Sequence, residues 1–302
     1  MTHKLLLLLY KIIPFKKQYV ILIKKIFPDY YEPSYIPEGF FKIKDDVSGK
    51  YISMFIRSDS NIEREIFWNG LYGKWEKESL KIWAHLSRQA NTILDIGANT
   101  GIFSLLAEIQ NTNAGIYAIE PIDVNYEVLA KNIKRNKSGI HPIRAALSNT
   151  SGKAKMYMIK DRLNYMTSIN DNRYLDPPQM PGTPEVIEVE VSAITFNNIQ
   201  QQYAIAKLDL LKIDVEGHEV AVLENMYQQI IKDRPVILTE VMGDENAEAL
   251  NSMFKPLGYK FISIDEQKKS IEVDSLWNNN HHNFLLCGQK EIDALRKVNL
   301  IN

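Results

Sequence analysis

Acidic residues and a histidine are concentrated in one short segment, where Asp214, Glu216, His218 and Glu219 directly follow the apolar run 208–213. A charge at the end of an apolar strand is costly to desolvate, so we expect Asp214 to serve a ligand. Histidine titrates near neutral pH and can take a proton from a weakly nucleophilic hydroxyl. We therefore predict Asp214 or His218 as a general base and Glu216 as a residue that orients a bound molecule. The alternative for His218 is a structural role at a helix start, where Glu216 or Glu219 could also act through the helix dipole alone.

A second segment, Asp95-Ile96-Gly97-Ala98-Asn99-Thr100-Gly101, is typical of a ligand-binding turn between a strand and a helix. Its glycines permit a tight turn and a close approach of the backbone to a ligand. The third glycine of a dinucleotide-binding fingerprint is missing, and a phosphate would meet the charge of Asp95 unfavourably. S-adenosylmethionine carries an ammonium and a sulfonium but no phosphate, so the segment predicts a site for this methyl donor. Asp95 suits these cations either by direct contact or by ordering the loop. The residues expected to bind it are Asp95, Gly97, Ala98, Asn99 and Gly101.

Glu120 ends the next apolar run, about twenty residues beyond the glycine segment. At that spacing a carboxylate can accept both hydroxyls of an adenosine ribose. Pro121 fixes the direction of the chain behind it, and we assign both residues to the donor site. Asn125 and Asn132 lie two turns apart on the following helical segment, where they either brace this corner or belong to the helix surface.

A regular alternation of strands and helices, which begins at residue 92, must position these segments. Near-continuous apolar runs separated by helical patterns indicate a parallel sheet with helices on both faces. The expected strands are 92–96, 115–119, 141–147, 208–213, 235–241 and 258–264, and the expected helices are 100–110, 123–136, 217–231 and 245–254. We expect 283–287 to form a last strand at the sheet edge. Strand-like segments at 153–159 and 185–191 flank a proline-rich loop that is long enough to be functional.

Together these residues resemble the FkbM methyltransferase family. The resemblance rests on the segment 95–101, on Ile119-Glu120-Pro121 with Asn125 and Asn132, on Ala145-Ala146-Leu147-Ser148 and on the segment 212–219, and it covers roughly residues 70 to 265. It implies a Rossmann-like α/β fold with a seven-stranded sheet whose last strand is antiparallel. It also implies that Ala146 and Asp214 contact the donor. The implied activity is S-adenosylmethionine-dependent O-methylation, with a hydroxyl of a sugar, a glycan or a small metabolite as the acceptor.

The N-terminal part of the chain lies outside this resemblance. We expect residues 1–70 to be a helical extension and lead-in segment, and residues 71–302 to be the methyltransferase domain. Within residues 1–30, apolar clusters alternate with lysines, but no run reaches the ~20 residues that span a bilayer and no signal-peptide cleavage site is evident. Such a segment could form a helix on a membrane surface, or a helix that packs on its own domain or on another subunit.

The charges of the whole chain are balanced, with 36 basic and 37 acidic side chains among 302 residues. This balance gives no bulk attraction to nucleic acid, so we expect no nucleic-acid partner and instead a small-molecule or glycan acceptor. Cys287 is the only cysteine, which excludes an internal disulfide and agrees with a cytoplasmic location, with residues 1–30 as a potential membrane contact.

Three alternatives stay open at the level of the sequence. Asp214, Glu216 and Glu240 could hold a divalent cation through their oxygens, but no tight carboxylate cluster is visible and we expect no metal. The chain could bind the donor without turnover, as a scaffold, although the acids at 214–219 argue against it. A nicotinamide-dependent oxidoreductase is disfavoured by the glycine pattern.

Overall fold

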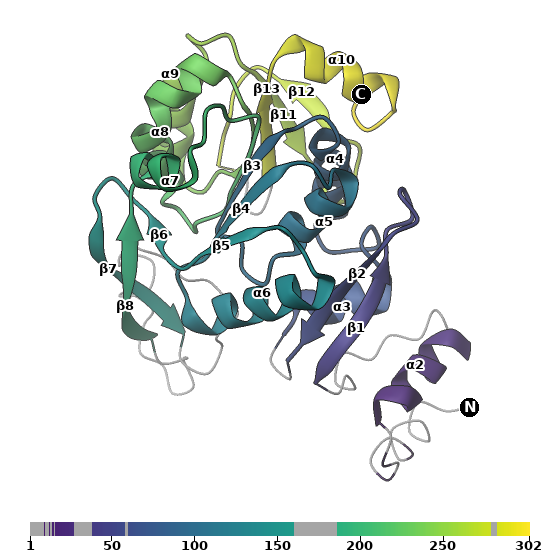
Figure 1. The fold of residues 1–302 in the computed structure, drawn as a ribbon. Coiled ribbons are helices and arrows are strands. Elements are labelled where there is room, and N and C mark those ends of the chain that lie inside the picture. The colour runs from purple at the N-terminus through teal and green to yellow at the C-terminus, as the bar shows by residue number, and fades with distance from the viewer. Residues whose placement is uncertain are drawn as a thin grey trace, which may run out of the picture.

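The computed structural model describes residues 16–26, 38–57, 60–159, 186–278 and 283–302, together with the single residues 9, 12 and 14. Within these ranges the chain forms a large mixed sheet, two smaller sheets and the helices that pack on them (Figure 1). The proline-rich loop expected at 160–184 lies outside the described residues.

The large sheet has eight strands in the described part of the chain (Figure 1). In spatial order they are β12 (Ile271–Val273), β11 (Lys260–Ile264), β13 (Asn283–Cys287), β10 (Val236–Glu240), β9 (Leu210–Ile213), β3 (Thr92–Ile96), β4 (Gly115–Ile119) and β5 (His141–Ile143). The strands from β10 to β5 are parallel to one another. The predicted α/β fold class with a Rossmann-like sheet is confirmed, and β12 adds one short strand to the expected seven.

The last strand is antiparallel, as predicted, but its place in the sheet differs from the expectation. β13 pairs with β10 on one side and with β11 on the other, antiparallel to both. The prediction that 283–287 forms the sheet edge is therefore wrong. Four of its five residues are buried, and a strand that is apolar on both faces suits the interior of a sheet.

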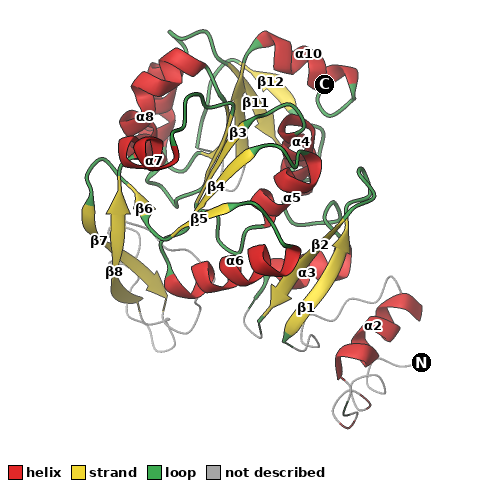
Figure 2. Cartoon of the chain, in the orientation of Figure 1, coloured by secondary structure: helices red, strands yellow, loops and turns green. Residues whose placement is uncertain are grey.

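Helices cover both faces of the sheet. One hydrophobic cluster contains side chains of α4 (Lys77–Ser87), α5 (Ile102–Gln110), α6 (Asp123–Asn136) and α10 (Gln289–Lys297), and a second contains those of α7 (Phe196–Tyr203), α8 (Glu219–Asp233) and α9 (Asp244–Phe254). Figure 2 shows α7, α8 and α9 on one side of the sheet and α4 and α5 on the other. Ile93 of β3 belongs to the first cluster and Leu94 to the second, because successive side chains of a strand point to opposite faces.

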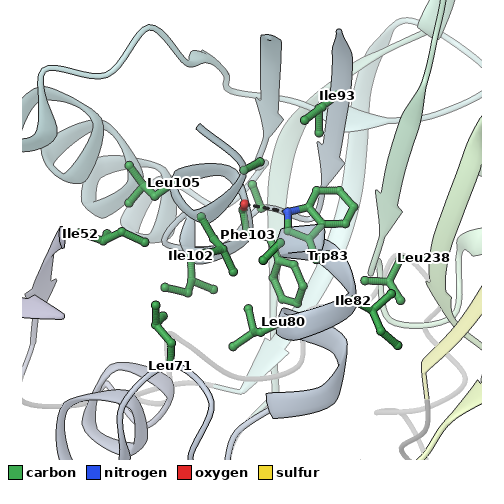
Figure 3. Packing of buried hydrophobic residues seen from close by; sticks show 14 of the residues in the cluster. Ile52, Leu71, Leu80, Ile82, Trp83, Ile93, Ile102, Phe103, Leu105 and Leu238 are labelled. Carbon is green, nitrogen blue, oxygen red and sulfur yellow. Dashed lines mark hydrogen bonds between the residues drawn. The ribbon is translucent and has the colours of Figure 1, made fainter. Parts of the chain in front are cut away.

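Trp83 lies at the centre of the first cluster and is fully buried. Its indole Nε1 donates to the carbonyl of Phe103 at 2.9 Å (Figure 3), and the two rings meet edge to face with centroids 5.7 Å apart. This contact fixes α4 against the first turn of α5, the helix that follows the glycine segment. The packing of α4 therefore holds the start of α5 in place.

The segment expected as one strand at 141–147 is divided between two sheets. β5 ends at Ile143, and β6 (Ala146–Leu147) pairs in parallel with β8 (Val186–Ile194), which also pairs with β7 (Gly152–Ile159). The chain turns between the two pieces at Arg144, an exposed residue that forms an ion pair with Asp123. A polar residue at that position lets the chain leave the large sheet and enter the smaller one.

The N-terminal elements pack against the same core. A hairpin of β1 (Gly39–Lys44) and β2 (Tyr51–Ile56) lies beside α6 (Figure 1), and the amide of Phe55 donates to the side-chain oxygen of Asn132 at 2.8 Å. α3 (Ile62–Asn69) follows the hairpin, and α2 (Lys16–Ile26) lies beyond it. Buried side chains of the hairpin belong to the cluster that contains α5, so these elements support the glycine segment from outside.

Candidate active site

The three segments singled out in the sequence meet at one cavity of about 580 Å³ at the carboxyl ends of β3, β4 and β9. In open α/β sheets, ligands bind at this end of the strands. Of the predicted site residues, Gly97, Ala98, Asn99, Glu120, Pro121, Ala146, Asp214, Glu216 and His218 line the cavity. Asp95 and Gly101 are not among the cavity-lining residues in the described part of the chain.

Gly97 allows the strand ends to come together at the floor of the cavity. Its φ of 80° lies in the left-handed region, and a Cβ atom there would come within 1.8 Å of the carbonyl oxygen of Asp214. The backbone directly after β9 therefore occupies the space that a side chain would need. The tight turn predicted for this glycine is what the geometry requires, whereas the predicted close approach of its backbone to a ligand stays a prediction.

Gly101 precedes α5 and has a φ of 91°. A Cβ atom at this position would lie 2.5 Å from Cδ1 of Leu129 on α6. Gly101 therefore has a packing role, since the residue lets α6 approach the start of α5, and its predicted contact with the donor stays a prediction.

Glu120 is 4% exposed and its two carboxylate oxygens are tied to the backbone. One accepts from the amide of Asn99 at 2.8 Å and the other from the amide of Ile122 at 2.9 Å. Burial raises the pKa of Glu120 to about 7, although these amides and the side chain of Asn125 oppose the rise by hydrogen bonding to the charged form. A carboxylate offers about four acceptor positions, and the two amides and Asn125 use three of them, so the group can still accept a hydroxyl from a ligand in the cavity.

Asp95 lies beneath the glycine segment rather than in the cavity. It is fully buried, and its Oδ2 accepts from the hydroxyl of Ser104 on α5 at 2.6 Å. Burial raises the pKa of Asp95, while the nearby ammonium of Lys212 lowers it. Of the two roles that the sequence left open for this acid, contact with a bound cation or ordering of the loop, the geometry supports the second.

Asn125 and Asn132 are both buried, so neither belongs to the exposed helix surface. The side-chain amide of Asn132 donates to the carbonyl of Thr100 at 2.8 Å, and Thr100 in turn donates to the buried carboxylate of Glu63 on α3. These hydrogen bonds form the predicted brace at this corner: they connect α6 to the glycine segment and the glycine segment to α3. Asn125 lines the cavity beside Glu120, and its Oδ1 has no hydrogen-bond partner among the described residues.

The part of the cavity wall at the carboxyl end of β9 carries charge. Lys212 of β9 is 4% exposed, and its ammonium lies 2.8 Å from Oδ2 of Asp214 and 4.6 Å from the ring centroid of Phe103. Burial alone would lower the pKa of Lys212, but the carboxylates of Asp214, Glu76 and Asp95 outweigh it and raise the pKa. Lys212 is therefore a permanent cation within a largely acidic wall.

The turn before α8 is held by Glu219, which is fully buried. Its Oε1 accepts from the amides of Val215 and Gly217 at 3.2 and 2.9 Å. Glu216 has a φ of 55°, a backbone conformation that is uncommon for residues other than glycine, and it lines the cavity. Glu219 thus has the stabilising role left open for it, while the turn directs Glu216 to the cavity.

His218 stands at the start of α8 but makes no side-chain capping hydrogen bond. Its Nε2 is buried without a hydrogen-bond partner in the described part of the chain, and the residue lines the cavity. Burial lowers the pKa of His218 below its ordinary value of 6.5. The imidazole is consequently neutral at pH 7 and able to accept a proton from a ligand.

Several cavity-lining residues were not assigned from the sequence. Ile62, Met156, Met242 and Asn283 come from separate parts of the chain, and no local pattern distinguishes them. Glu76, next to the aromatic residues before α4, also lines the cavity. The described residues contain no group of three or more His, Cys, Asp or Glu side chains that could hold a metal ion, so the arrangement of Asp214, Glu216 and Glu240 does not form such a site.

Comparison with known proteins agrees with this geometry. Residues 95–261, more than half of the chain, match the family described as the Methyltransferase FkbM domain. The chain is 27% identical to Methyltransferase sdnD of Sordaria araneosa, with 45% of this chain and 61% of that protein covered.

Two further relatives have comparable similarity. The chain is 27% identical to 31-O-demethyl-FK506 methyltransferase FkbM of Streptomyces tacrolimicus, with 45% of this chain and 59% of that protein covered. It is 23% identical to Hexuronic acid methyltransferase AglP of Haloferax volcanii, with 50% and 56% covered. The chain thus spans about three fifths of the length of these curated relatives.

Proposed function

Because the chain belongs to the FkbM methyltransferase family, we propose that it is an S-adenosylmethionine-dependent O-methyltransferase whose acceptor is a hydroxyl of a sugar, a glycan or a small metabolite. The observation that carries the proposal is that Glu120 and the glycine segment line the same cavity as His218 and Asp214. One wall suits an adenosyl group and the other a hydroxyl that must lose a proton.

The donor side of the cavity fits S-adenosylmethionine. Glu120 keeps a free acceptor position at the carboxyl end of β4, where a ribose would lie. Ala146, Leu147 and Met156 add an apolar wall, which suits the flat face of an adenine. When bound, S-adenosylmethionine would supply a methyl group whose bond to the sulfonium breaks as the bond to the acceptor oxygen forms, with S-adenosylhomocysteine as the leaving group.

His218 is the residue we assign as general base. Its neutral imidazole faces no competing hydrogen-bond partner among the described residues, so it can accept the proton that the acceptor hydroxyl loses on attack. Asp214 is less suited to this role because its carboxylate is held by the ammonium of Lys212. Glu216 then orients the acceptor, and fixed geometry in the cavity supplies much of the remaining rate.

The nature of the acceptor rests on the relatives. One is named for a hexuronic acid and one for a 31-O-demethyl compound, which supports an oxygen acceptor and places sugars among the classes to test first. The absence of an excess of basic residues over the whole chain supports an acceptor other than a polynucleotide.

Calorimetric titration of the protein with S-adenosylmethionine, S-adenosylhomocysteine and NAD tests the donor assignment. We expect micromolar binding of the first two and a loss of at least tenfold in Glu120→Ala, since a ribose hydrogen bond to a charged group is removed. Binding of NAD alone, or of none of the three, would overturn the proposal.

A screen for methyl transfer to sugars, glycans and small metabolites tests the second half of the proposal. We expect the methyl group of S-adenosylmethionine to be transferred to a hydroxyl of one of these acceptors. Donor binding without turnover on any of them would instead favour the scaffold alternative.

A further inference from the structure

Glu76 is an acid that the proposed chemistry does not yet use. It directly precedes α4 in a left-handed conformation, with φ 39° and ψ 39°, and it lines the cavity. Its Oε2 accepts from the side-chain amide of Asn283 on β13 at 3.2 Å, and the same amide donates to Ser79 at 3.0 Å. A strained backbone is maintained only where the surroundings fix it, and here they fix a carboxylate at the cavity wall.

The surroundings make this carboxylate a site for a cation. Burial raises the pKa of Glu76 to about 8; Lys212 lowers it, and the neighbouring acids Asp214, Glu266 and Glu240 raise it. An anion in such a place is stabilised when a positive charge enters the cavity. Lys212 cannot fully provide that charge, because its ammonium already hydrogen-bonds Asp214.

The order of groups along the sheet indicates which part of a ligand would reach Glu76. Ala146 and Leu147 follow β5, Glu120 ends β4, and the glycine segment ends β3. β9 with Lys212 is next in the sheet. An adenosyl compound laid along this row has its adenine at β5 and its ribose at β4. The aminoacyl end then lies over β3 and β9, where the charges of Glu76 and Lys212 are found.

We propose that the carboxylate of Glu76 binds the ammonium group of the donor's aminoacyl end, with Asn283 holding the carboxylate in position. The inference rests on the proposed function, because it presupposes an adenosyl donor in the cavity. It transfers to Glu76 the contact that the sequence left open for Asp95, which is fully buried and bonded to Ser104.

A chemical double-mutant cycle tests the contact. Affinities of the wild type and of Glu76→Gln are measured by calorimetry for S-adenosylhomocysteine and for its deaminated analogue, in which hydrogen replaces the ammonium group. We expect Glu76→Gln to lower the affinity for S-adenosylhomocysteine by roughly 10- to 100-fold, the usual effect of losing a hydrogen bond to a charged group. The deaminated analogue should bind both proteins equally.

Glu78→Gln is the matched control, because Glu78 lies two residues away on α4 and pairs with Lys81 instead. It should leave both affinities unchanged. Equal loss for the two ligands in Glu76→Gln, or no loss for either, would overturn the inference. Failure of the wild type to bind S-adenosylhomocysteine would instead overturn the proposed function, so the two failures are distinguishable.

A second, independent observation concerns α2. Val20 and Ile23 are buried, and Lys24 hydrogen-bonds the carbonyl of Phe67 on α3. The opposite face of the helix carries Ile21 and Leu22, which are 48% and 51% exposed. One turn further on, Lys25 and Ile26 are also exposed. The ribbon places α2 at the outside of the described fold (Figure 1), and the exposed side chains form a stripe of large apolar residues with a lysine in it.

The charge of this region favours one occupant. The first 28 residues contain six lysines and no acidic residue. Among the described residues no helix is long and apolar enough to cross a bilayer. Amphipathic helices with apolar residues on one face and lysines beside them lie in the interface of membranes that contain anionic lipids. We infer that the exposed face of α2 binds a bilayer surface with anionic headgroups.

Co-sedimentation of the full chain with vesicles tests this surface. We expect binding to vesicles that contain phosphatidylserine and roughly fivefold weaker binding in Lys25→Glu, since each juxtamembrane lysine contributes about 1 kcal/mol. Leu22→Asp should abolish binding, whereas Val47→Asp, at an equally exposed apolar residue of the β1–β2 turn, should not. No binding to anionic vesicles, or self-association of the chain that Leu22→Asp removes, would overturn the inference.

Discussion

Among single residues, His218 and Asp214 differ in how well each could act as the general base of the proposed reaction. Both line the cavity, but only Asp214 is engaged in an ion pair, with Lys212 at 2.8 Å. The Nε2 atom of His218 is buried and has no hydrogen-bond partner among the described residues, so proton transfer to it would break no existing hydrogen bond.

We expect His218→Asn to lower kcat by roughly 10²- to 10³-fold, the range typical for loss of a general base. Its affinity for S-adenosylhomocysteine should stay within a factor of two. Because burial lowers the pKa of His218, the acidic limb of the wild-type pH–rate profile should lie below pH 6.5 and be absent in the variant. A modest loss of rate in His218→Asn beside an inactive Asp214→Asn would reject the histidine as the base.

The two raised carboxyl pKa values predict how the ligand-free protein responds to pH. Burial raises the pKa of Glu76 to about 8 and that of Glu120 to about 7, from 4.5 in an unfolded chain. The folded state therefore binds these protons more tightly, and its stability is lost as the pH rises from 4.5 through 7 and 8. Glu120→Gln should raise the free energy of unfolding at pH 8 by on the order of 2 kcal/mol.

Urea denaturation of the wild type and of Glu120→Gln at pH 5 and pH 8 measures this effect. The difference between the two proteins should be small at pH 5 and large at pH 8. A constant difference would show that the carboxyl group is not titrating in this range.

Most donor-site residues could be identified from their spacing, but the contact that each one makes could not be predicted. Glu120 could be predicted because a carboxylate about twenty residues beyond the glycine segment is typical of a ribose-binding position. Asp95 and Glu76 are both acids beside apolar residues, and only the packing of Ser104 under one and of Asn283 against the other tells them apart.

At the scale of elements, the turn after β3 depends on the absence of a side chain. Gly97→Ala would place a Cβ atom 1.8 Å from the carbonyl oxygen of Asp214, at a φ of 80°. We expect it to lower the free energy of unfolding by more than about 3 kcal/mol, because the backbone directly after β9 must move. Gly49→Ala provides the control, since its φ of 72° is similar but no atom lies within 4 Å of the added Cβ.

Gly49→Ala should lower the free energy of unfolding only by the cost of a left-handed alanine, about 1–2 kcal/mol. Denaturant titration followed by circular dichroism measures both. Equal losses in the two variants would mean that the close approach of Asp214 contributes nothing.

Elements with a clear period were predicted closely, and elements defined by their neighbours were not. β3, β4 and α6 have the expected bounds, because apolar runs and a helical face mark them in the sequence. The separation of β5 from β6 depends on pairing with β8, about fifty residues later. Likewise, the interior place of β13 depends on the pairing of β10 and β11 with it, which local sequence does not encode.

At the scale of the whole molecule, an element far from the sheet supports the donor site. The buried carboxylate of Glu63 on α3 accepts from the hydroxyl of Thr100 in the glycine segment. We expect Glu63→Ala to weaken S-adenosylhomocysteine binding by roughly tenfold, since an unsatisfied buried hydroxyl loosens the segment. Glu65→Ala, on the same helix but paired with Lys74, should have no effect on this affinity in the same calorimetric titration.

The position of β13 also sets when this protein can finish folding during its synthesis. β13 is 283–287, so it leaves the ribosome after every other strand of the large sheet, yet it fills the gap between two of them. Until then β10 and β11 have open edges, and such edges on a nascent chain invite pairing with other chains. Asn283, which holds Glu76, arrives at the same moment, so a translating ribosome that stops before residue 283 releases a chain with both an exposed sheet and an incomplete cavity.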